Sequence, residues 1–131
     1  MYTVYSITCA ATGRKYFGQT SNYALRVRKH KTQMRGRNHD CYRINNDVRQ
    51  YGIDTFVFEV LHENLNKFMA LALECKYVFE AWDRQDNLLY NVQIPSPMIR
   101  DSDDPIAAAL LVPVIRRKME LLGDSYYVNK E

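Results

Sequence analysis

The sequence predicts an α+β domain, with a small three-stranded antiparallel sheet flanked by helices in the order β-β-α-α-β-α and a C-terminal helical tail. Two short β-like runs lie close together near the N-terminus, and a third run, T-F-V-F-E-V-L, occupies residues 55–61. The segments between and after these runs repeat apolar residues at helical spacing. A hairpin followed by helices and one later strand therefore accounts for most of the chain.

The first two strands are expected at residues 2–8 and 15–20. The short loop between them contains Gly13, which suits the positive φ of a hairpin turn. The run at 55–61 is rich in Phe and Val, residues that favour strands. We expect it to complete the sheet.

Two helices are expected between the second and third strands. Asn22 can cap a helix over about 23–35, because its side chain can accept a hydrogen bond from a free backbone N–H of the first turn. A second helix over about 41–51 precedes Gly52, a residue typical of the position just after a helix.

A long third helix follows the last strand. It begins after Asn64 or Asn66 and extends to Trp82, with an apolar stripe on one face. Glu74 flanks this stripe. The run L-L-Y-N-V at 88–92 is expected to return the chain to the core.

The composition changes after this run, so we place one domain over residues 1–92 and a linker with a C-terminal helical extension over 93–131. Prolines and aspartates over 94–105 indicate a linker or an extended strap. Pro113 should break or restart a helix. The amphipathic segment 114–123 either folds back on the core or forms a homodimer contact.

The chain has 131 residues, a length typical of one domain. No apolar run approaches the roughly 20 residues of a membrane helix, and the N-terminus lacks a signal-peptide pattern. We expect a soluble, cytoplasmic protein without a membrane partner, in the host cytoplasm if a virus encodes it. The three cysteines are far apart, which favours buried free thiols over a zinc site or disulfides.

Positive charge is concentrated in the first part of the chain. Residues 1–50 contain ten Lys/Arg and two acidic residues, whereas residues 51–131 contain eight Lys/Arg and thirteen acidic residues. Such an excess can neutralise phosphates. A solvated basic face without a partner is the alternative.

Three groups of side chains could do chemistry. Glu74 lies at the edge of a packed face, where a carboxylate is unfavourable unless it is paired or metal-bound, although a helix neighbour such as Lys67 could pair with it. Arg26 and His30 are one helical turn apart, and an Arg fork suits phosphate oxygens. A basic surface helix would show the same pair.

Tyr5 and Tyr16 lie on the two strands of the predicted hairpin, which brings their rings together. Strand tyrosines are often packing residues. A nearby cation such as Lys15 or Arg14 could lower the pKa of a phenol, so that its tyrosinate takes a proton from water.

These elements occur in an order that resembles the GIY-YIG nuclease family. The run T-V-Y (3–5) stands where the family has G-I-Y, and Y-F-G (16–18) stands at Y-I-G. The pair Arg26 and His30, the loop residue His39, the run at 50–61, Glu74 and Tyr90-Asn91 follow at fitting intervals. Thr3 and Phe17 depart from the motif, but the side chains that could do chemistry are all present. These are Tyr5, Tyr16, Arg26, His30 and Glu74.

The resemblance implies a role for each of five catalytic residues. Tyr5 would be the general base or would position the attacking water, and Tyr16 would support the nucleophile and the phosphate. Arg26 would stabilise charge on the transition state, and His30 would assist by hydrogen bonding or proton transfer. Glu74 would hold one Mg²⁺ or Mn²⁺ ion.

Supporting roles would fall to Lys15, to His39 and to Asn91, the last as a structural residue beside the site. Basic residues would hold the backbone of double-stranded DNA. The candidates are Arg14, Arg28, Lys29, Lys31, Arg35, Arg37 and Arg43.

The predicted function is therefore a metal-dependent DNA endonuclease that hydrolyses phosphodiester bonds. A free-standing homing-type or phage-borne nuclease acting on foreign or competing DNA fits a chain without a long DNA-binding region. A restriction-type enzyme and a structure-specific repair nuclease are alternatives. A catalytically idle module that binds nucleic acid or protein is the alternative from another class.

Overall fold

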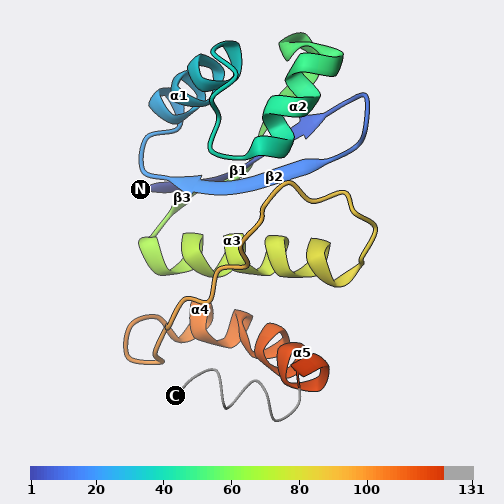
Figure 1. Cartoon of the computed structure of the whole chain (residues 1–131). Coiled ribbons are helices and arrows are strands. Elements are labelled where there is room, and N and C mark those ends of the chain that lie inside the picture. The colour runs from blue at the N-terminus through green and yellow to red at the C-terminus, as the bar shows by residue number, and fades with distance from the viewer. Residues whose placement is uncertain (123–131) are drawn as a thin grey trace.

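A computed structural model of the chain describes residues 1–122, which form a layered α+β structure (Figure 1). The sheet has three antiparallel strands in the order β2-β1-β3. Helices α1 and α2 lie on one side of it, α3 lies on the other, and α4 and α5 lie beyond α3. The elements are β1 (Tyr2–Cys9), β2 (Lys15–Thr20), α1 (Tyr23–Arg35), α2 (Tyr42–Tyr51), the 3-10 turn η1 (Ile53–Thr55), β3 (Phe56–Leu65), α3 (Lys67–Asp83), α4 (Pro105–Leu110) and α5 (Val112–Leu122). The predicted fold class is confirmed.

The N-terminal hairpin sets the orientation of the tyrosines. Tyr5 is paired with Gly18, and Ile7 is paired with Tyr16. Directly paired residues of neighbouring strands project from the same face of a sheet. Both tyrosines therefore project from the face that α1 and α2 cover. Gly13 in the connecting turn has φ +80°, as its predicted role requires.

Helices α1 and α3 begin at predicted capping residues, and the structure decides between the two candidates for α3. The side chain of Asn22 accepts a hydrogen bond from the Leu25 amide at the start of α1. Asn66, rather than Asn64, does the same for Met69 at the start of α3. Asn64 instead has a left-handed φ of 60°. Strand β3 continues past the predicted end at residue 61, because it pairs with β1 along its whole length through a register shift.

Three apolar clusters hold the layers together. The first lies between the sheet and the α1–α2 side and includes Tyr5, Ile7, Met34, Ile44 and Tyr90. The second lies between the sheet and α3 and comprises Phe17, Val78, Ala81 and Leu89. The third joins α3 to the C-terminal helices through Ala72, Cys75, Phe79, Ala107, Leu111 and Val114. Cys9, Cys41 and Cys75 are buried free thiols, as predicted.

The C-terminal helices fold back on α3. Val114 of α5 is buried in the third cluster, and the Arg117 guanidinium lies 3.0 Å from the Asp83 carboxylate. Of the two predicted uses of this helix, packing on its own core is observed, and a homodimer through it has no support. The predicted break falls at Leu111, between α4 and α5, and Pro113 is the second residue of α5. The predicted stop at Gly123 lies outside the described residues.

The segment after α3 returns along the open edge of β2. Lys15 donates a backbone hydrogen bond to Leu88, and Tyr90 donates one to Lys15. Asn91 then bonds both the N–H and the C=O of Phe17 at 2.9 Å. These contacts close the sheet edge and fix the start of the following strap. Within residues 1–122, no helix has the length and apolar character needed to span a membrane.

Candidate active site

A cleft of about 580 Å³ opens beside β2, between α1 and α3. Tyr16 comes from β2, Arg26 and His30 come from α1, and Glu74 comes from α3. His39 in the loop before α2 also lines it, and residues 92–96 of the strap form another wall. Four of the five predicted catalytic side chains thus meet at one cavity, although they come from three separate elements.

Tyr5, the fifth, lies behind the cleft wall. Its side chain is 1% exposed, and its ring packs against those of Tyr16 and Tyr23, with centroids 6.5 and 5.8 Å away. Its hydroxyl oxygen lies 2.7 Å from Nε2 of His30. Of the two predicted tyrosines, Tyr16 therefore lines the cleft, and Tyr5 reaches the site through His30.

A chain of hydrogen bonds continues from His30 into the next loop. Nδ1 of His30 lies 2.7 Å from Nε2 of His39, and the two rings are stacked at 4.9 Å. The backbone N–H of Cys41 donates to Nδ1 of His39 at 3.0 Å. The loop itself is tied to α2 by Asn45, which accepts from the His39 N–H and donates to the His39 C=O, both at 2.8 Å. His39 thus lies in the cleft wall beside His30, and its supporting role stays a prediction.

Burial keeps both histidines neutral. It lowers the pKa of His30 to about 3, helped by the nearby His39 and Arg26, and it also lowers the pKa of His39. Burial raises the pKa of Tyr5 and of Tyr16 above the ordinary value, and Arg26 only partly opposes this. At neutral pH the site therefore holds neutral imidazoles and neutral phenols beside one guanidinium.

Glu74 is the carboxylate that α3 brings to the cleft. Burial raises its pKa to about 7. The Gln19 N–H and Arg26 favour the charged carboxylate and lower the pKa, but burial outweighs them. Lys67 does not pair with it: among the described residues, no ion pair includes Glu74. A partly buried carboxylate that lacks an ion pair is unfavourable by itself, so a cation at this position would be stabilising.

The residues present fit a divalent ion of the Mg²⁺ type. Residues 1–122 contain no group of three or more His, Cys, Asp and Glu side chains that could enclose a metal. Mg²⁺ does not need one, since it is commonly bound by one or two carboxylates, waters and the phosphates of a substrate. Glu74 at the wall of an open cleft supplies such a carboxylate.

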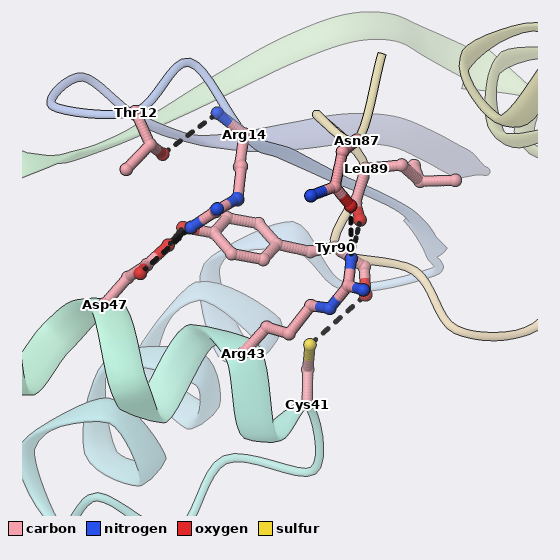
Figure 2. A network of polar contacts seen from close by, with 8 residues as sticks. All are labelled: Thr12, Arg14, Cys41, Arg43, Asp47, Asn87, Leu89 and Tyr90. Carbon is pink, nitrogen blue, oxygen red and sulfur yellow. Dashed lines mark hydrogen bonds and ion pairs between the residues drawn. The ribbon is translucent and has the colours of Figure 1, made fainter. Parts of the chain in front are cut away.

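Two of the predicted DNA-binding arginines are engaged inside the protein (Figure 2). Arg14 contacts both carboxylate oxygens of Asp47, at 3.1 and 3.2 Å, and the Tyr90 hydroxyl donates to the same carboxylate. Arg43 donates to the Leu89 carbonyl at 3.2 Å. Neither lines the cleft. Arg14 fastens the loop before β2 to α2, and Arg43 fastens the segment around Tyr90 to α2.

The remaining basic candidates lie around α1. Lys29 lines the cleft. Lys31 lies over the Phe58 ring at 5.4 Å, and the other predicted residues, Arg28, Arg35 and Arg37, are exposed outside the cleft. Lys15 is exposed on β2 and is also not part of the cavity wall.

The sequence did not reveal the parts of the site that depend on backbone contacts. The Cys41 amide, the Asn45 side chain and the strap at 92–96 carry no motif. Asn91 was predicted as a structural residue beside the site, and its side chain makes two hydrogen bonds to the Phe17 backbone.

The chain is similar in sequence and in fold to known proteins. The family model for the GIY-YIG catalytic domain matches residues 1–89. The fold is similar to a solved structure of the catalytic domain of the intron endonuclease I-TevI, in a glutamate-to-alanine mutant form. The TM-score is 0.62 and the identity 16%, over 73% of this chain and 98% of that one. No curated protein sequence gives a significant match. The match of the family model over residues 1–89 shows that the chain belongs to the GIY-YIG family and is an endonuclease of that type.

Proposed function

We propose that this protein hydrolyses phosphodiester bonds of double-stranded DNA in the cleft beside β2, with a divalent metal ion held by Glu74. The observation that carries the proposal is the convergence of Tyr16, Arg26, His30 and Glu74 on one cavity. A cation, a carboxylate and phenol and imidazole groups have no packing reason to share an open cleft. Together they suit a bound phosphate.

The position of each side chain indicates its role. Arg26 presents two or more N–H donors to the phosphate oxygens and stabilises the charge that builds up there. Tyr16, on the wall, is placed to hydrogen-bond the phosphate or the attacking water. His30 orients Tyr5 behind this wall. The raised pKa of Tyr5 means that a general-base role would require it to lose its proton first.

The metal would be held by Glu74, waters and phosphate oxygens. When bound, Mg²⁺ or Mn²⁺ polarises the scissile phosphate and its leaving oxygen. The same ion would favour the ionised form of Glu74, whose pKa burial alone raises to about 7. The metal would therefore lower the pKa of Glu74 again and offset the cost of its burial.

Supercoiled plasmid tests the proposal. The wild-type protein is expected to nick or linearise it with Mg²⁺ and to leave it intact with EDTA. Glu74→Ala and Arg26→Ala should lose cleavage, whereas Glu80→Ala, exposed on the same helix as Glu74, should retain it. Cleavage in EDTA, or by Glu74→Ala at the wild-type rate, would rule out the metal role.

The catalytically idle alternative has its own signature in the same assay. A binding module would shift the plasmid in a gel without nicking it under any divalent metal. The free-standing homing-type or phage-borne setting is a proposal that rests on the sequence resemblance alone. Discrete product bands on phage and host DNA would test it.

A further inference from the structure

The hydrogen-bond chain from Cys41 to Tyr5 has a direction, and the backbone sets it. A backbone N–H can only donate, so Nδ1 of His39 must accept from Cys41 and carries no proton. A neutral imidazole has one protonated nitrogen. The proton of His39 is therefore on Nε2, which faces His30.

The same reasoning passes to the next ring. Nε2–H of His39 points at Nδ1 of His30 across 2.7 Å, so Nδ1 of His30 must accept. The proton of His30 is then on Nε2, 2.7 Å from the Tyr5 hydroxyl oxygen. The reverse direction would place two N–H groups against each other at His39 and Cys41.

Tyr5 therefore accepts a hydrogen bond from His30, and the Tyr5 hydroxyl proton must point elsewhere. Among residues 1–122, the only hydrogen bond described for this hydroxyl is the one with His30. A buried hydroxyl proton without an acceptor is unfavourable. The wall formed by Tyr16 and His30 lies between this hydroxyl and the cleft.

We infer that the Cys41 amide and the Asn45 side chain fix His39 and His30 as Nε2–H tautomers, so that the Tyr5 hydroxyl accepts from His30 and keeps its own proton free to donate. Asn45 is the positioning residue. Its side chain holds both backbone groups of His39, and this keeps the ring aligned between Cys41 and His30. Besides His39, the described hydrogen bonds join Asn45 to one other residue of the cleft wall, Cys41, whose C=O accepts from the Asn45 N–H at 3.3 Å. The role of the donated hydrogen bond rests on the proposed nuclease function.

Histidine side-chain ¹⁵N spectra test the direction without any substrate. The chain has three histidines, and His62, paired with Tyr77, can be identified by substitution with Gln. His30 and His39 are both expected as Nε2–H tautomers in the wild-type protein. An Nδ1–H tautomer at either residue would overturn the inference, whether or not the protein cuts DNA.

Cleavage kinetics then test the positioning role. Asn45→Ala should release His39, weaken the Nε2–H signal of His30 and lower the cleavage rate about 10- to 100-fold, with DNA affinity unchanged. Asn46→Ala, exposed on the same helix, is the matched control. Asn45→Asp, which keeps the acceptor for the His39 N–H, serves if the Ala variant does not fold. Wild-type spectra and rates in folded Asn45 variants would refute the role.

Discussion

The Tyr5 ring lies directly against the backbone of Gly18. A Cβ atom placed on Gly18 would be 2.5 Å from the Tyr5 hydroxyl oxygen and 2.6 Å from its Cζ. Gly18 does not have a positive φ, so the absence of a side chain, not backbone freedom, is what this position requires. The glycine makes the space in which Tyr5 reaches His30.

Gly18→Ala should therefore impair the site. We expect a loss of about 1–3 kcal/mol in unfolding free energy from overpacking and a cleavage rate about 100-fold lower, because the Tyr5 hydroxyl must leave His30. Urea denaturation and plasmid cleavage measure the two effects. Gly13→Ala is the control: its φ of +80° is strained for alanine, but a Cβ there meets nothing. It should lose about 1 kcal/mol and keep its cleavage rate. Wild-type cleavage by Gly18→Ala would contradict the structural role.

Glu74→Gln should stabilise the protein at neutral and alkaline pH. Because burial raises the pKa of Glu74 from 4.5 to about 7, the folded wild-type protein loses stability as pH rises from about 4.5 through 7. The glutamine side chain of the variant does not ionise, so the variant does not lose stability over this pH range. With solvent screening of a partly exposed group, we expect a gain of about 1–2 kcal/mol at pH 8 and a smaller one at pH 5, with cleavage abolished.

Denaturant unfolding at both pH values, without metal, measures this gain. Glu80→Gln is the matched control, because Glu80 is exposed and its contact with Lys76 spans 3.7 Å. Its stability should change by a few tenths of a kcal/mol. An equal effect of both variants would show that Glu74 is not destabilised by its surroundings.

The sequence predicted what depends on periodicity and local chemistry. Asn22, Gly13 and Gly52 mark element ends through their own side chains or backbone freedom, so they can be recognised from neighbours in the sequence. The five residues predicted to be catalytic were chosen because they occur in the order that the family resemblance requires. The burial of Tyr5 and the clamp of Asn45 on His39 could not be predicted, because each depends on tertiary packing.

The assignment of basic residues shows the same limit. From the sequence alone, Arg14 and Lys29 were equally good candidates for DNA binding, because a sequence does not show which charged side chains pair inside the protein. In the structure Arg14 contacts a buried carboxylate, and Lys29 lines the cleft. The two residues should therefore respond differently to the same substitution.

Arg14→Gln should weaken the fold. It removes the cation from Asp47, whose side chain is 6% exposed, and leaves that carboxylate with the Tyr90 hydroxyl. Because Arg14 is partly exposed, we expect a loss of about 2 kcal/mol rather than the larger cost of a fully buried pair. Thermal denaturation measures it. The double variant Arg14→Gln/Asp47→Asn should recover part of the loss, and no recovery would mean that the pair is not the cause.

Lys29→Gln should change DNA binding instead. A lysine on the cleft wall that neutralises one phosphate releases about one counterion, so its removal should reduce the slope of log affinity against log salt by about 1. The fold should be unaffected, since Lys29 is exposed. Arg116→Gln removes the same charge from an exposed position on α5, on the far side of α3 from the sheet (Figure 1), and should leave the slope unchanged. Fluorescence anisotropy of a labelled duplex in Ca²⁺, titrated from low to high salt, measures both slopes. Equal slopes for the two variants would show that the long-range charge of the domain, not a contact at the cleft, holds the DNA.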